Sequence, residues 1–117
     1  MLLTSHKVNG CNNEIDIFAY DVPGPGGAYH HYGFEHNGLV IGDIYFQKGG
    51  IKEVGINGVT NEALLAVVEH RLECFQKEIF ACRENAIALT KIQEAMMWLQ
   101  KRTNDRIKRN VEGTQQV

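Results

Sequence analysis

The stretch that decides the fold runs from Cys82 to Asn110 and reads CRENAIALTKIQEAMMWLQKRTNDRIKRN. It contains neither glycine nor proline, and its apolar side chains recur at the spacing of an amphipathic helix. The stripe that they form has a heptad-like order and consists of Ala88, Leu89, Ile92, Ala95, Met96 and Leu99. The sequence therefore predicts one long helix over about residues 82–110.

A shorter helix is predicted immediately before it. Thr60 is suited to be the N-cap, and Glu62 in the first turn interacts favourably with the helix dipole. Apolar residues then follow at helical spacing, namely Leu64, Val68, Leu72 and Phe75. The pattern breaks near residues 77–81, where Ile79 and Phe80 are expected to pack at a turn. Since two long helices joined by a few residues lie antiparallel, residues 60–110 are predicted to form a helical hairpin.

Residues 1–58 are rich in glycine, contain both prolines and carry short stretches of alternating character. Strands are predicted at residues 15–20, 29–36 and 39–46, with a fourth short strand at 51–56. Asn37-Gly38 is a type I′ hairpin signal, because both of its positions accept a positive φ. The predicted fold class is α+β, with a small N-terminal antiparallel sheet of three or four strands followed by the helical hairpin. A single domain, 1–117, would hold the β-rich part (1–58), the hairpin (59–110) and a tail (111–117).

Composition narrows the class of protein. Of the 117 residues, 44% are hydrophobic and 22% are charged, which is typical of one globular domain and excludes disordered and collagen-like chains. No apolar run is long enough to span a bilayer and the first 20 residues lack the features of a signal peptide, so a cytoplasmic protein without a membrane partner is expected. Three cysteines without a CxxC pair favour reduced thiols. A net charge of −2 argues against polymeric nucleic acid as a partner.

Polar residues continue the apolar stripe at both of its ends. Asn85 lies three residues before Ala88, and Arg102 and Arg106 lie three and seven residues beyond Leu99. One interpretation is that the stripe ends there and the arginines cap the helix C-terminus and its dipole. The other is that two guanidinium groups one turn apart form a phosphate clamp, because their forks bind phosphate oxygens bidentately. The spacing leaves both interpretations open.

Other candidate sites are weaker. Adjacent His30 and His31 point to opposite faces of a strand, and no cysteine or carboxylate completes a ligand set with them and His36, so no metal is expected. The Gly24–Gly27 run is not a P-loop, since no Gly-Lys-Ser/Thr follows it. Trp98, off the stripe, either stacks on a base or packs on a neighbouring chain. No nucleophile, base and orienting residue can be assembled, so neither an enzyme nor a bound cofactor is expected.

An ordered set of motifs runs along the predicted hairpin and its tail, at residues 82–91, 98–103, 105–106 and 111–114. This set resembles the hairpin that is shared by two phage counter-defence families, Thoeris anti-defence protein 1 and anti-CBASS protein 2. Residues 51–58, leading into 61–65 and Arg71-Leu72, are similar to the first family specifically, because the second is all-helical. The resemblance covers residues 44–117 well and the first 43 in general character. Glu78-Ile79 departs from it, standing where a turn-forming pair such as Gly-Pro is expected.

The resemblance implies a sponge, a protein that binds cyclic nucleotide messengers of bacterial immune enzymes in the host cytoplasm without cleaving them. For the Thoeris family the ligand is glyco-cyclic ADP-ribose, joined through a ribose–ribose bond, and some hexameric relatives also bind cyclic trinucleotides in a separate pocket. The resemblance places the ligand contacts on Phe75, Asn85, Arg102 and Arg106. Lys77 and Arg83, near the predicted turn, are further candidates for phosphate contact.

Helix geometry adds a constraint on such a site. Asn85 and Arg102 lie 17 positions apart, which is roughly 26 Å along one straight helix at about 1.5 Å per residue, too far for one messenger to reach both. If all the contacts serve one ligand, two chains must pack their long helices antiparallel, and a homodimer or hexamer carries sites shared between chains. Two other classes of function stay open: a protein-interaction module that binds an acidic host partner, and a small nucleotide-processing enzyme.

Overall fold

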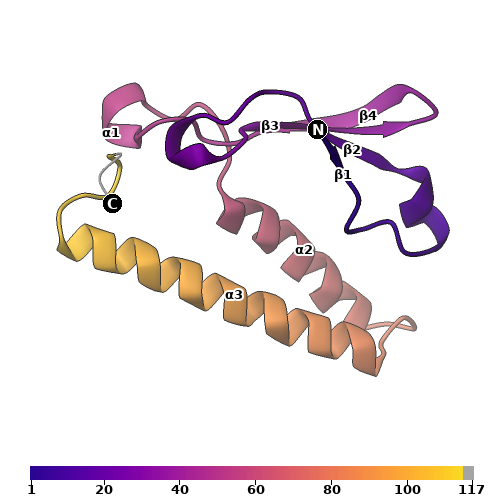
Figure 1. The fold of residues 1–117 in the computed structure, drawn as a ribbon. Coiled ribbons are helices and arrows are strands. Elements are labelled where there is room, and N and C mark those ends of the chain that lie inside the picture. The colour runs from indigo at the N-terminus through magenta and orange to yellow at the C-terminus, as the bar shows by residue number, and fades with distance from the viewer. Residues whose placement is uncertain (115–117) are drawn as a thin grey trace. The chain divides into compact units, whose positions relative to one another are not determined.

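The computed structural model of the chain describes residues 1–114 (Figure 1). They divide into two compact units, one of residues 1–59 with 113–114 and one of residues 60–112. The first unit holds the strands β1 (Leu2–Leu3), β2 (Asp16–Ala19), β3 (His31–His36) and β4 (Leu39–Tyr45), and the short helix α1 (Ile51–Val54). The second holds α2 (Asn61–Gln76) and α3 (Arg83–Lys108). The α+β class is confirmed.

The sheet is an antiparallel meander in the order β1-β2-β3-β4. The three strands predicted at 15–20, 29–36 and 39–46 are confirmed as β2, β3 and β4. Asn37 and Gly38 form the turn between β3 and β4 with φ values of +50° and +78°, as a type I′ turn requires at both of its central positions. A shift of register between Phe34 and Glu35 interrupts the pairing of these two strands.

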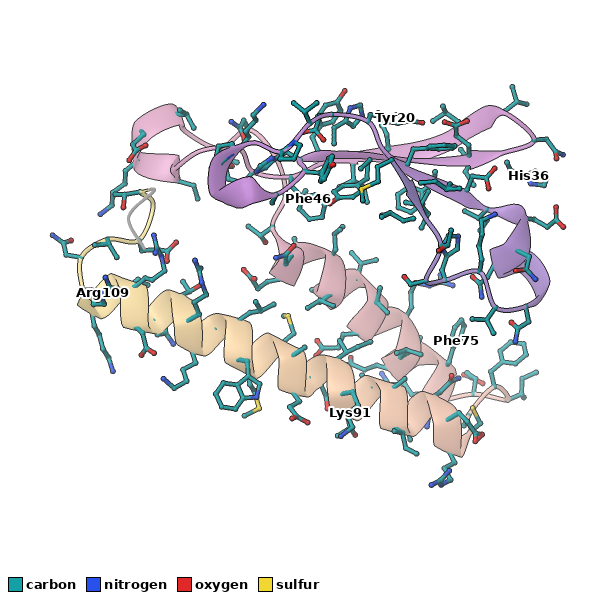
Figure 2. The ribbon with its side chains drawn as sticks, viewed as in Figure 1. Tyr20, His36, Phe46, Phe75, Lys91 and Arg109 are labelled. Atoms are coloured by element: carbon teal, nitrogen blue, oxygen red, sulfur yellow. The ribbon has the colours of Figure 1, made fainter. Side chains whose placement is uncertain are left out.

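One face of the sheet carries a row of rings in contact. His31 stacks on Tyr45 with the ring centroids 4.0 Å apart. Tyr20 (labelled in Figure 2) packs closely against Gly33, where an added Cβ would come within 2.0 Å of the Tyr20 ring. The Tyr20 hydroxyl donates to Glu35 Oε2 at 2.5 Å. This hydrogen bond is the main cause that raises the pKa of Tyr20 to about 12, and burial is the second cause. Glycine at position 33 is therefore what lets the ring pack down on β3.

The prediction of a fourth strand at residues 51–56 is wrong, because residues 51–54 form α1 instead. The N–H groups of Glu53 and Val54 donate to the Gly50 carbonyl (2.9 Å each), and that of Lys52 donates to the Gly113 carbonyl (2.8 Å). Gly55, at a φ of +77°, ends the turn. Backbone groups committed in this way are no longer available to a sheet, and the fourth strand is β1, which pairs with β2 and was not anticipated.

The predicted helical hairpin is confirmed, with slightly shorter helices. Thr60 is the N-cap of α2, and its hydroxyl accepts the Ala63 N–H at 3.1 Å. Cys82 is the N-cap of α3, and its sulfur accepts the Asn85 N–H at 3.4 Å. The two helices run antiparallel, joined by residues 77–82 (Figure 1).

The inner face of α3 differs in part from the predicted stripe. One row of positions shielded from solvent alternates at spacings of four and three and consists of Asn85, Leu89, Ile92, Met96, Leu99, Thr103 and Arg106; outside this row, Asp105 is also partly shielded. Ala88 and Ala95, which the predicted stripe includes, are exposed, as is Arg102. The narrower row arises because a single partner helix covers only a two-in-seven stripe.

No apolar side chain of α2 or α3 is fully buried in the structure as described. Met97 and Trp98 are 66% and 65% exposed, and Ile79, expected to pack at the turn, is 88% exposed. Two helices alone cannot surround a core, so the hairpin keeps apolar surface open to solvent. None of the described helices combines the length and apolar character needed to cross a membrane.

Candidate functional site

The turn end of the hairpin is held by the side chain of Gln76. Its Nε2 donates to the Cys82 carbonyl at 3.1 Å, and the Cys82 N–H donates to its Oε1 at 3.0 Å. One amide thus closes both ends of the connection at residues 77–82, using a donor and an acceptor of the same group. The last residue of α2 and the N-cap of α3 are thereby fixed next to each other, which brings side chains of the two helices together.

Phe80 stands between two of the residues that the resemblance assigns to the ligand. Its ring meets that of Phe75 edge to face, with centroids 5.9 Å apart and an interplanar angle of 80°. Its carbonyl accepts a hydrogen bond from Asn85 Nδ2 at 3.4 Å. Phe75 and Asn85 are both half-buried. An aromatic ring and an amide from two helices therefore share one neighbour at the turn (Phe75 is labelled in Figure 2).

The same cluster contains Arg71, which sequence reasoning did not single out. Its guanidinium carbon lies over the Phe75 ring, 5.4 Å from the centroid, within the range of a cation–π contact. The signal that could have found it is the spacing, because residues four apart on a helix lie on one face. Arg71, Phe75, Phe80 and Asn85 form the group that we call the turn-end cluster.

Lys77 and Arg83 flank this cluster. Lys77 is the C-cap of α2, and its N–H donates to the Cys74 carbonyl at 3.2 Å. Arg83 is the first residue of α3. Both side chains are exposed, so two cationic side chains border the turn end of the hairpin.

The opposite end of α3 is closed by a Schellman motif. Asn110 has a left-handed backbone (φ +58°), its N–H donates to the Ile107 carbonyl at 3.0 Å, and the Val111 N–H donates to the Arg106 carbonyl at 3.1 Å. The Arg106 side chain reinforces this end, because its Nη2 donates to the Val111 carbonyl at 3.0 Å and its Nε to Glu112 at 3.1 Å. Arg106 is only 8% exposed, so its guanidinium holds the chain beyond the helix end.

The two arginines of the predicted clamp therefore lie in different environments. Arg106 is buried and bonded to its own chain, as the capping interpretation expects. Arg102, one turn earlier, is exposed, and no hydrogen bond or ion pair engages its side chain within residues 1–114. Nearby, Lys101 bonds Asp105 at 2.7 Å, which lowers the pKa of that carboxyl. The exposed cations of this end are Arg102, Lys108 and Arg109.

The two ends of the candidate site lie on one uninterrupted helix. α3 runs without a break through Asn85 and Arg102, so the roughly 26 Å between them at about 1.5 Å per residue applies to the structure as well. The structure brings Phe75 and Asn85 together and places Arg102 and Arg106 at the far end of α3. Within a single chain, the four residues form two half-sites.

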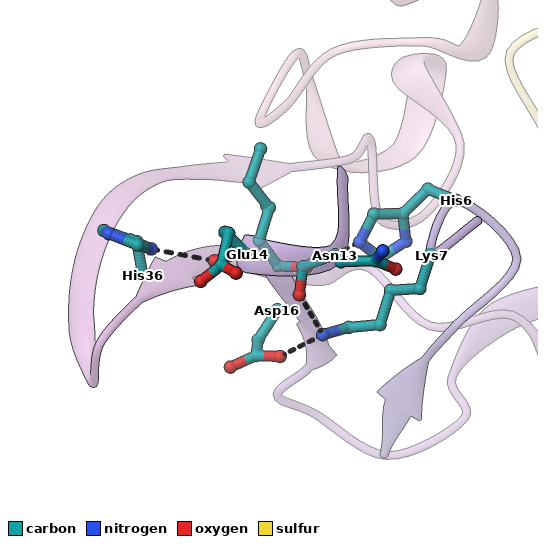
Figure 3. Close-up of polar contacts among 7 residues, drawn as sticks. His6, Lys7, Asn13, Glu14, Asp16 and His36 are labelled. Carbon is teal, nitrogen blue, oxygen red and sulfur yellow. Dashed lines mark hydrogen bonds and ion pairs between the residues drawn. The ribbon is translucent and has the colours of Figure 1, made fainter. Parts of the chain in front are cut away.

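The four histidines of the sheet unit, His6, His30, His31 and His36, lie among structural contacts of that unit. The N–H groups of His30 and His31 donate to the Asp21 carboxylate; burial opposes ionisation there, but these bonds outweigh it and lower the pKa of Asp21. The His36 ring donates to the Glu14 carbonyl at 2.9 Å, and His6 donates likewise to the next carbonyl along the chain (Figure 3). In the described part of the chain, no three His, Cys, Asp or Glu side chains gather as a metal site would require.

All three cysteines are free thiols. Cys74 Sγ lies 3.7 Å from the His70 ring nitrogen Nε2, one helical turn away on α2. His70 and Cys74 have the same four-residue spacing as Arg71 and Phe75, which places both members of each pair on one face of α2.

Two comparisons with known proteins bear on this hairpin. The family model described as "Acb2/Tad1, hairpin domain" matches residues 40–104, more than half of the chain. A protein of Bacillus phage SBSphiJ7 named "Thoeris anti-defense 1" is 54% identical over 74 residues, which are 63% of this chain and 52% of that protein. The chain thus spans about half the length of this relative. With most of β4, all of α1 and α2, and most of α3 inside the matched region, the chain belongs to the Acb2/Tad1 hairpin-domain family.

Proposed function

We propose that this chain is a phage counter-defence protein that binds and sequesters a cyclic nucleotide messenger, glyco-cyclic ADP-ribose, without cleaving it. One observation carries the proposal: Phe75 and Asn85 meet on Phe80 at one end of the hairpin, while α3 carries Arg102 and Arg106 at the other. An aromatic face, an amide and the exposed guanidinium group of Arg102 are the chemistry that an adenine nucleotide with a pyrophosphate requires. The similarity to a phage protein named "Thoeris anti-defense 1" supports the counter-defence part of this proposal.

The site is proposed to form between two chains. In an antiparallel pair of α3 helices, the turn-end cluster of one chain meets the arginine-bearing end of the other, and a two-fold dimer carries two equivalent sites. The exposed Met97 and Trp98 and the absence of a buried apolar core in the hairpin, as far as the structure describes it, favour such a partner.

Each residue type has a definite role in this site. Phe75 offers its ring to the adenine base, a stacking contact worth about 1–3 kcal/mol. Asn85 has donors and an acceptor for a ribose hydroxyl or a purine edge. Arg102 pairs with the pyrophosphate, with Lys77 and Arg83 as further phosphate contacts. Sequestration requires slow release rather than transition-state stabilisation, so the proposed activity is binding and not catalysis.

Release of the ligand by heat tests this function. The protein is incubated with glyco-cyclic ADP-ribose, freed of unbound ligand, heat-denatured, and the supernatant is analysed by mass spectrometry. Recovery of the intact messenger is the expected result. Recovery of an altered nucleotide would identify an enzyme, and the absence of any retained nucleotide would leave an interaction module for an acidic partner as the better hypothesis.

The shared site is tested by mixing two variants. A heterodimer of one Asn85→Ala chain and one Arg102→Ala chain carries one site with both lesions and one site with neither. After subunit exchange, confirmed by mass labelling, binding at native affinity should recover at half of the heterodimer's sites. No recovery after confirmed exchange would refute the placement of these residues in one site between two chains and would favour the helix-capping interpretation of the arginines. Light scattering should give a multiple of 13.2 kDa, a dimer or a hexamer, and a monomer would contradict the shared site.

A further inference from the structure

The contact between Arg71 and Phe75 has a consequence for any base that stacks on this ring. The Arg71 guanidinium lies over one face of the Phe75 ring, 5.4 Å from the centroid. Arg71 is exposed and Phe75 is half-buried, and Phe80 contacts the same ring in an edge-to-face arrangement. A ligand that stacks on the face beneath Arg71 must therefore contact or displace this guanidinium.

The guanidinium of Arg71 is also available for a ligand. No hydrogen bond or ion pair joins it to an acceptor in the part of the chain that the structure describes, and it is held by the aromatic contact alone. Arg106 is the opposite case, since two of its nitrogens are bonded to Val111 and Glu112. A planar, weakly hydrated cation with five N–H donors is well matched both to a base face and to phosphate oxygens.

We propose that Arg71 is a ligand-binding residue: the adenine base enters between Phe75 and the Arg71 guanidinium, which then stacks on the outer face of the base and donates to a phosphate oxygen. This inference rests on the proposed function and names the part of the site that selects an adenine nucleotide. The Arg71 guanidinium loses its contact with the Phe75 ring and gains an equivalent contact with the adenine base, so the exchange costs little cation–π energy. The half-buried Phe75 remains in place, and the movement falls on the long, exposed Arg71 side chain.

The competing possibility has the opposite sign. If Arg71 only covers Phe75 and leaves when a ligand arrives, then removing it frees the ring and tightens binding. If Arg71 contacts the ligand, then removing it weakens binding. The direction of the change in affinity therefore decides between the two.

Titration calorimetry with glyco-cyclic ADP-ribose provides the test, using the full chain and the variants Arg71→Ala, Arg71→Lys and Arg109→Ala. Arg71→Ala should bind about 10-fold more weakly, the loss of roughly one charge-assisted contact. Arg71→Lys should recover part of this loss, because the ammonium keeps the charge but lacks the planar fork. Arg109→Ala removes an exposed arginine far from the turn-end cluster of its own chain and should weaken binding by less than Arg71→Ala does.

Two further measurements, of stability and of binding by Asn85→Ala, distinguish the possible explanations of a change in affinity. The urea midpoint of Arg71→Ala should equal that of the wild type, because the side chain is exposed; a lowered midpoint together with weaker binding would assign Arg71 to stability and overturn the proposal. Unchanged or tighter binding by Arg71→Ala, with Asn85→Ala still weakened, would overturn the role of Arg71 alone. If the wild type binds no messenger, the proposed function fails and the role of Arg71 fails with it.

Discussion

Arg106 is expected to stabilise the fold, whereas Arg102, one turn away on the same helix, is not. Arg106→Ala removes the bond to the Val111 carbonyl and the pair with Glu112. A hydrogen bond from a charged group contributes about 1.5–3 kcal/mol. The pair with Glu112 contributes less, about 0.5–1 kcal/mol, because that carboxylate is 35% exposed and screened by solvent. The free energy of unfolding should therefore fall by about 2–4 kcal/mol.

The assay is urea unfolding followed by circular dichroism. Arg102→Ala is the matched control, since it removes an exposed arginine and should change the free energy of unfolding by less than about 0.5 kcal/mol. A double-mutant cycle with Glu112→Gln isolates the ion pair and should give a coupling energy of about 1 kcal/mol or less. The reasoning is refuted if Arg106→Ala and Arg102→Ala have equal effects on stability, because burial would then not distinguish the two arginines.

Three further outcomes are expected. Arg102→Ala should weaken messenger binding by about 1.5–3 kcal/mol, because its exposed guanidinium is the proposed pyrophosphate contact, and Arg109→Ala should weaken it by less; equal losses in calorimetry would indicate a diffuse basic patch. Gly58→Ala should destabilise the sheet unit by more than about 2 kcal/mol in urea unfolding, because its Cβ would lie 2.4 Å from the Phe46 carbonyl carbon, and a change below 0.5 kcal/mol would mean that the backbone gives way. The Tyr20 phenol should ionise near pH 12, as measured by the difference in near-ultraviolet absorbance between the wild type and Tyr20→Phe. Because the folded pKa of Tyr20 is raised, the stability that this group contributes is present below the unfolded pKa of about 10 and is lost as the pH rises through the folded pKa. An unshifted titration midpoint would show that the hydrogen bond to Glu35 is not formed.

Local patterns in the sequence identified most of the secondary structure. The helical hairpin follows from an uninterrupted apolar period and the N-cap at Thr60, and the β3–β4 turn follows from Asn37-Gly38. These features depend on interactions between residues a few positions apart, which a pattern records directly. The family resemblance carried by the same hairpin agrees with the family model that matches residues 40–104.

The segment at 51–56 shows where local patterns were insufficient. Its alternating apolar residues predict a strand, but the Gly50 carbonyl and Gly113, more than 50 residues away in the sequence, accept its N–H groups and make it a helical turn. β1 was missed for a related reason, since two leucines become a strand only by pairing with β2. Backbone hydrogen bonds between residues far apart in the sequence produce no periodic pattern of residue types, so the sequence does not reveal them.

The sequence by itself determined the hairpin, the family and the residue types that a nucleotide site needs. Only the tertiary structure decided how those residues are used: it joined Phe75 and Asn85 through Phe80, placed Arg71 over the Phe75 ring, and bonded Arg106 to its own chain while leaving Arg102 exposed. The physical reason is that the helical period fixes which face of the helix a residue occupies. The contacts that a side chain's donors and ring faces make also depend on neighbouring residues across a turn or beyond a helix end.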